Sequence, residues 1–154
     1  MEINFTPAEH THAELLVGLM REFCAYDRIP FDEPAVRAAL AEFVGDHRLG
    51  GVWLIETGGD VAGYIVLTVG FSFEFKGRDA FVDELYLREE FRGRGFGGRA
   101  LLFAEGAART LGVRALHLEV DRSNERAQAL YRRHGFRDHD RYLLTKWVDE
   151  ETMK

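Results

Sequence analysis

The spacing of hydrophobic and polar residues changes several times along the chain, and each change separates an expected helix from an expected strand. Apolar side chains that recur every three or four residues predict four helices. The helices run from Pro7 to about Asp27, from the capping residue Asp32 to the closing glycines Gly50 and Gly51, from about Gly95 to Leu111, and from about Asn124 to His134.

Between the helices lie shorter segments rich in β-branched and aromatic residues, which predict six strands. They are Glu2–Thr6, Val52–Thr57, Val61–Phe71, Ala80–Leu87, Ala115–Val120 and Arg141–Val148. The intervening sequence Gly58-Gly59-Asp60 predicts a hairpin between the second and third strands. The order βααβββαβαβ is typical of an α/β (α+β) fold, in which helices cover the faces of a mixed sheet.

The size of the chain limits how many such folds it contains. A chain of 154 residues, with 46% apolar residues, is long enough for one buried core and too short for two ordinary domains. We therefore expect residues 1–154 to form a single domain.

A glycine-rich turn joins the fourth expected strand to the third expected helix. Its sequence is Arg92-Gly93-Arg94-Gly95-Phe96-Gly97-Gly98. Backbone N–H groups and the positive end of the helix dipole converge at such a turn, and glycines allow the backbone to approach phosphate oxygens closely. The turn therefore predicts a phosphate-binding site, although glycines after a strand also make plain tight turns.

The same glycines fit a second pattern, the dinucleotide fingerprint G-x-G-x-x-G, which Glu119 follows at about the expected distance. Two features disfavour this interpretation. The charged segment Arg88–Arg92 separates the strand from the first glycine, and the chain after Glu119 is too short to complete a nucleotide-binding half.

Four motifs occur in a fixed order between Ala80 and Arg137. They are Phe81-Val82-Asp83-Glu84-Leu85-Tyr86-Leu87, Arg92-x-x-Gly95-x-Gly97, Asn124-x-x-Ala127-x-x-Leu130-Tyr131 and Gly135-Phe136. The ordered set resembles the GNAT superfamily of N-acetyltransferases, and the preceding β-α-α-β-β order matches the first half of that family's fold. The resemblance implies a mostly antiparallel sheet with a central splay, and direct attack of an amine on acetyl-CoA in a ternary complex.

The resemblance also implies how acetyl-CoA is bound. The pyrophosphate is expected at Arg92, Gly93, Arg94, Gly95, Phe96, Gly97 and Gly98, with Asn124 and Arg126 nearby, and the pantetheine at unpaired backbone groups of Leu85, Tyr86 and Leu87. Tyr131 matches the family's tyrosine that protonates the departing thiolate, a role that a phenol can fill as general acid. For Asn124 a simple helix cap is the alternative role.

Two adjacent strand acids, Asp83 and Glu84, are the expected candidates for the base that deprotonates the amine. Because side chains alternate across a strand, we expect only one of them to face the acceptor. In similar polyamine-type enzymes the carboxylate lies at the position of Asp83. Glu84 remains an alternative, and either acid could instead pair with an arginine of the turn.

The expected acceptor pocket lies among the first two helices and the loop before the fourth strand, as the resemblance implies. Its candidate residues are Tyr26, Asp27, Phe31 and Glu74. Acids beside aromatic rings suit an organic cation, so we expect a small-molecule amine. A protein N-terminus or lysine is the alternative acceptor, and a non-catalytic acyl-CoA sensor is the alternative class of protein.

Composition narrows the expected partners. The formal net charge of −6 is unfavourable for a nucleic-acid binder. The N-terminal sequence lacks the features of a signal peptide, no segment has the composition of a membrane span, and Cys24 is the single cysteine, so we expect a cytoplasmic protein. The histidine spacings match no common metal motif, so we expect no metal. The family resemblance is compatible with a homodimer formed through the C-terminal strands, and the sequence leaves the oligomeric state open.

Overall fold

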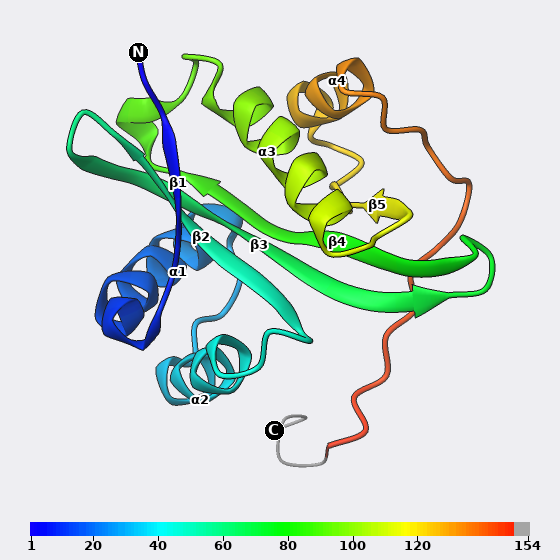
Figure 1. Ribbon diagram of the computed structural model, residues 1–154, viewed down its shortest axis with the longest axis horizontal. Helices are drawn as coiled ribbons and strands as arrows, with labels where there is room; N and C mark the ends of the chain where they lie inside the picture. Colours follow the sequence, from blue (N-terminus) through cyan, green and yellow to red (C-terminus); the bar gives the residue numbers. More distant parts are fainter. Residues whose placement is uncertain (150–154) are drawn as a thin grey trace.

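The computed structural model describes residues 1–149 and arranges them as a mixed sheet with helices on both faces (Figure 1). The strands are β1 (Asn4–Pro7), β2 (Gly50–Thr57), β3 (Asp60–Ser72), β4 (Gly77–Leu87) and β5 (Ala115–His117). The α-helices are α1 (Ala13–Asp27), α2 (Glu33–Val44), α3 (Phe96–Thr110) and α4 (Glu125–Arg133), with 3-10 turns at His10–His12 and Glu89–Phe91. The predicted α/β fold class is confirmed.

The strands lie in the order β1-β2-β3-β4-β5, and the pairs are antiparallel except for β4 and β5, which are parallel. Helices α1 and α2 cover one face of this sheet, and α3 and α4 lie on the other (Figure 1). Gly63 allows β3 and β4 to pair closely, because a Cβ at this position would lie 1.9 Å from the carbonyl oxygen of Tyr86.

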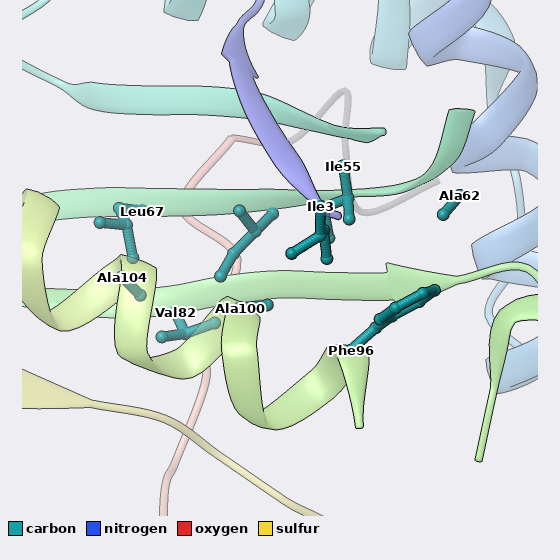
Figure 2. Packing of buried hydrophobic residues seen from close by; sticks show 9 residues of the cluster. Ile3, Ile55, Ala62, Leu67, Val82, Phe96, Ala100 and Ala104 are labelled. Atoms are coloured by element: carbon teal, nitrogen blue, oxygen red, sulfur yellow. The ribbon is translucent and has the colours of Figure 1, made fainter. Parts of the chain in front are cut away.

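Each face of the sheet buries its own hydrophobic core. On one face the first turns of α3 press Phe96, Ala100 and Ala104 onto the sheet (Figure 2). These small and aromatic side chains recur at helical spacing, as the sequence predicts. On the other face the apolar side of α1, including Leu16 and Leu19, packs against Tyr64 and Tyr86.

The sheet opens between β4 and β5, which confirms the predicted splay. Their pairing covers Asp79 to Phe81 on β4 and ends at the pair Phe81 and His117, whereas β4 continues to Leu87. On the β3 side, Val66 pairs with Glu84 and Leu67 pairs with Val82, so Asp83 forms a β-bulge within the pairing. A bulge bends its strand and re-aims side chains, and this one lies beside the splay.

Two predicted boundaries in the first half of the chain are wrong. Residues up to Pro7 pair with β2, so α1 begins at Ala13 instead of Pro7. Helix α2 is capped by the Asp32 side chain, as predicted. It ends at Val44 and does not extend to Gly50, which belongs to β2. At Gly50 (φ 138°) a Cβ would lie 1.9 Å from the Leu67 carbonyl oxygen, so this glycine is required for strand contact and not for helix closure.

The predicted last strand, Arg141–Val148, is absent from the sheet within the described residues 1–149. This segment leaves α4 and runs past the β3–β4 hairpin away from the helices (Figure 1). Its apolar side chains are exposed, including Leu144 and Val148, each 90% exposed. The segment therefore has the composition of a strand, but it pairs with no sheet edge within the described part of the chain.

Candidate functional site

The glycine-rich turn presents a set of backbone N–H groups at the start of α3. Gly93 (φ 73°) and Gly95 (φ 81°) adopt the left-handed conformation that glycine favours. Within residues 1–149, no amide of residues 93–98 donates to a protein acceptor, and the first bond of the helix runs from the Arg99 amide to the Gly95 carbonyl (3.2 Å). These amides and the helix dipole form a site that favours an anion.

The last two glycines of the turn have a different structural role. A Cβ on Gly97 would lie 3.3 Å from Cδ2 of Leu130, and a Cβ on Gly98 would lie 2.9 Å from Nε2 of His134. Both contacted residues belong to α4 or follow it directly. Gly97 and Gly98 therefore allow α4 to pack closely on the first turn of α3, which places the α4 residues beside the anion site.

The start of α4 contributes a cation to this site. A Cβ on Gly93 would lie 4.0 Å from Nη2 of Arg126, so the Arg126 guanidinium lies next to the turn, as predicted. Asn124 caps α4, because its Oδ1 accepts from the Ala127 amide (3.1 Å). The cap fixes the start of the helix and thus the position of Arg126.

The two arginines of the turn itself point elsewhere. The Nε of Arg92 donates to the Leu87 carbonyl (2.8 Å), and its guanidinium carbon lies 4.0 Å from the ring centroid of Tyr26. Arg94 is exposed, and its guanidinium lies 5.8 Å from the ring centroid of Phe91. Phe96 points into the core (Figure 2), so it contributes a backbone amide alone to the site.

The predicted pantetheine-binding strand has its side chains engaged in the two cores. Leu85 and Leu87 pack on the α3 face, and Tyr86 packs on the α1 face. The main chain of this strand therefore remains available at the splay. A ligand that binds like an added strand would use main-chain groups of this kind.

Tyr131 lies on α4 and is half-buried, with its ring 6.1 Å from that of Phe136. Burial raises the pKa of the Tyr131 hydroxyl, and the negative charge of Asp27, at the end of α1, raises it further. The phenol therefore keeps its proton at neutral pH, which is the state that a proton donor requires.

The two strand acids differ in their surroundings. Glu84 accepts a hydrogen bond from the Tyr64 hydroxyl (2.6 Å). Burial raises the pKa of Glu84, the Tyr64 hydrogen bond partly opposes this, and the charges of Asp83 and Asp27 raise it again. Neither acid forms an ion pair with Arg92 or with the other arginines among residues 1–149.

Asp83 occupies the bulge, and its carboxylate has no hydrogen-bond or ion-pair partner within residues 1–149. Its carboxylate reaches solvent, yet the surrounding protein removes enough hydration to raise its pKa. The bulge also interrupts the strict alternation on which the prediction for these two acids relied. Glu84 joins Tyr64 on the α1 face because its strand neighbour Asp83 takes up the extra position.

Three of the four predicted acceptor residues lie at the end of α1 and in the loop after it. Tyr26 is in ring contact with Tyr86, and Phe31 packs against the α1-side core. Asp27 is close enough to Glu84 and Tyr131 to raise the pKa of both.

Glu74 is not brought to this group. It lies in the turn between β3 and β4, at the opposite end of β4 from Leu87, where its carboxylate forms two hydrogen bonds with Arg141 (2.8 and 2.6 Å). That ion pair anchors the beginning of the C-terminal segment to the hairpin.

An ion pair near the site was not anticipated from the sequence. Glu22 on α1 accepts from Arg88 (3.3 and 3.2 Å) and from the Tyr86 hydroxyl (3.5 Å), and this links α1 to the end of β4. The signal available in the sequence was weak, because an acid on a helix and a base after a strand are ordinary surface residues.

The model of the Acetyltransferase (GNAT) family matches residues 16–136. Thialysine N-epsilon-acetyltransferase from Bos taurus is 30% identical over 132 residues, which cover 80% of this chain and 77% of that protein. The uncharacterized N-acetyltransferase YycN from Bacillus subtilis is 36% identical over 69 residues, and the match spans 45% of this chain and 44% of that protein.

Solved structures agree with the fold. An integron cassette protein from the mobile metagenome of Cole Harbour Salt Marsh superposes with a TM-score of 0.83 and 35% identity, covering 94% of this chain and 90% of the other. A predicted acetyltransferase from Clostridium acetobutylicum, solved with acetyl-CoA, has a TM-score of 0.79 at 16% identity and covers 94% of this chain and 96% of its own. No helix within residues 1–149 is long and apolar enough to span a bilayer.

Proposed function

Because the chain belongs to the Acetyltransferase (GNAT) family, we propose that it acts as a single domain that transfers the acetyl group of acetyl-CoA to a primary amine of a small molecule. The observation that carries this proposal is the joint position of two features. The amides of residues 93–98 have no protein acceptor within residues 1–149, and α4, which bears Tyr131, packs on that same turn.

The turn fits the diphosphate of coenzyme A. Amides of residues 93–98 supply hydrogen-bond donors, and Arg126 supplies a charge beside Gly93. The similar structure solved with acetyl-CoA supports this choice of cosubstrate. The thioester supplies an activated acetyl carbon, and the main chain beyond Phe81 on β4 supplies an edge along which an extended ligand can lie.

The remaining task of the protein is to move two protons. The attacking amine must lose one proton, and the thiolate that leaves when the carbon–sulfur bond breaks must gain one. Asp83 takes the amine proton, directly or through water, because its carboxylate is unpartnered within residues 1–149 and its raised pKa makes it a better base. Tyr131 gives its phenolic proton to the sulfur.

The acceptor is a cation, because two further carboxylates, those of Asp27 and Asp83, lie close enough to Glu84 to act on it electrostatically. The charges of Asp27 and Asp83 both raise the pKa of Glu84. An ammonium group placed there relieves this mutual repulsion and contacts the exposed ring of Tyr26. The 30% identity to thialysine N-epsilon-acetyltransferase supports a small amine.

A panel of acceptors tests the function. Thiol release from acetyl-CoA is measured with diamines and polyamines, amino acid derivatives, aminoglycosides, and peptides with free N-termini or lysines. We expect turnover with at least one small polycationic amine and little with peptides. Turnover with peptides alone would establish the protein acetyltransferase instead, and binding of acetyl-CoA without turnover of any amine would establish a sensor.

We also propose a homodimer in which the C-terminal segment of each copy covers the other. The outer edge of β5 pairs with no strand within residues 1–149. An open groove lies beside it, lined by β5, the end of α3, α4 and the start of the C-terminal segment. Residues 141–148 carry the apolar side chains that such a groove requires, but expose them in the single chain.

Light scattering tests the dimer. We expect a mass of twice the 17.6 kDa of one chain, and we expect Leu144→Asp to give the monomer mass, because a buried charge at this position would be costly. A wild-type protein that remains monomeric at high concentration would exclude a dimer in which the C-terminal segment of each copy covers the other.

A further inference from the structure

Arg92 has an unexpected position for the first residue of a phosphate-binding turn. Its side chain runs away from the N-terminus of α3 and toward α1. The guanidinium carbon lies 4.0 Å from the ring centroid of Tyr26 and 5.7 Å from that of Tyr86, and Nε donates to the Leu87 carbonyl (2.8 Å). Arg92 therefore contacts the last residue of β4 and the last turn of α1 at once.

Tyr26 belongs to the part of α1 that forms the expected acceptor wall. It lies one helical turn after Glu22, so both side chains project from the same side of α1. Glu22 joins this side of the helix to Arg88, and Tyr26 joins it to Arg92. Arg88 directly follows β4, whereas Arg92 is the first residue of the glycine-rich turn.

We propose that Arg92 is a positioning residue that couples the acceptor wall to the cofactor turn through its stack on Tyr26. This inference rests on the proposed function. An ordered turn holds Arg92 over the Tyr26 ring, and an ordered Tyr26 holds the first residue of the turn in place. Each ligand then helps the other to bind, since a coupling between two binding sites is reciprocal.

The size of the coupling follows from the stack. Tyr26 is 61% exposed, so the contact lies at the weaker end of cation–π interactions, which corresponds to about a 2- to 5-fold change in affinity. The alternative is that Arg92 turns to the diphosphate when coenzyme A binds, and in that case Tyr26 has no influence on cofactor affinity.

Calorimetric titration with coenzyme A separates these alternatives. Tyr26→Leu removes the ring and is expected to weaken coenzyme A binding about 2- to 5-fold, whereas Tyr26→Phe keeps the ring and is expected to bind like wild type. The matched control is Phe31→Leu, because Phe31 is on the same wall but its ring faces Arg21 at 5.1 Å. We expect Phe31→Leu to leave coenzyme A affinity unchanged.

A double-mutant cycle completes the test. In an Arg92→Gln background, Tyr26→Leu is expected to have no further effect on coenzyme A affinity. In steady-state assays Tyr26→Leu is expected to raise the KM for the amine with little change in kcat. Unchanged coenzyme A affinity in Tyr26→Leu, an equal loss in Phe31→Leu, or the same loss in the Arg92→Gln background would each overturn the inference. If wild type itself binds no coenzyme A, the proposed function fails first.

Discussion

Replacing Tyr131 with Phe is expected to lower kcat about 10²- to 10³-fold while the affinity for coenzyme A changes less than about 3-fold. The substitution removes one hydroxyl and keeps the ring that packs near Phe136. The thiolate then leaves without its proton donor, and this raises the barrier of the chemical step without affecting the diphosphate contacts.

The measurement is thiol release under saturating acetyl-CoA with the best acceptor from the amine panel, beside a coenzyme A titration. Tyr142→Phe is the matched control, because Tyr142 is 85% exposed on the C-terminal segment. A Tyr131→Phe enzyme with kcat close to that of wild type would assign the proton donor to another group or to water.

Asp83→Asn is expected to lower kcat/KM for the amine about 10²-fold near neutral pH. The effect follows from the loss of a carboxylate that is unpartnered within residues 1–149 and whose pKa burial has raised. The base acts in its deprotonated form, so the wild-type rate rises as pH increases through this raised pKa. Asp83→Asn lacks the carboxylate, so the rate of this variant no longer rises as pH increases through the pKa of Asp83.

Glu84→Gln provides the matched control, because the amide oxygen still accepts the hydrogen bond from the Tyr64 hydroxyl. We expect this variant to keep kcat within a few-fold of wild type and to retain the acidic limb. The opposite pattern, with Glu84→Gln inactive and Asp83→Asn active, would reverse the roles of the two acids.

The local features of the fold could be predicted because they depend on neighbours in the sequence. Helix α3 carries small residues at helical spacing, and the glycine-rich turn must precede it, so both follow from periodicity and backbone conformation. Asn124 stands where a cap is needed and caps α4. The motif order added the splay between β4 and β5, which no local pattern reveals.

What could not be predicted depends on contacts between distant segments. The bulge at Asp83 arises from the register between β3 and β4, so simple alternation was insufficient to orient Glu84. The direction of Arg92 depends on the distant ring of Tyr26, which offers a better contact than solvent. The sequence assigns Gly97 and Gly98 to phosphate binding, whereas their neighbours in the structure are side chains of α4 and its C-terminal cap.

The C-terminal segment is a different kind of failure. Its pattern predicts a strand, yet a strand forms only when an edge accepts it, and Arg141 is bound to Glu74 at the hairpin. The prediction is therefore wrong about the pairing of this segment, although the composition of the segment is that of a strand. Similarly, the sequence places Glu74 in the acceptor loop, because nothing in the sequence reveals that Arg141 pairs with it.

In the proposed function, backbone amides of the glycine-rich turn bind the diphosphate of coenzyme A, and a calorimetric titration of three proteins measures their contribution. Gly95→Ala and Gly112→Ala place the same methyl group at opposite ends of α3, at φ 81° and 74°, and neither Cβ has an atom of residues 1–149 within 4 Å. Both variants are therefore expected to lose similar stability, about 1–2 kcal/mol. We predict saturable binding by wild type and by Gly112→Ala, and binding at least about 10-fold weaker in Gly95→Ala. If wild type does not bind coenzyme A, or if the two variants bind it with equal affinity, the turn amides do not bind the diphosphate as proposed.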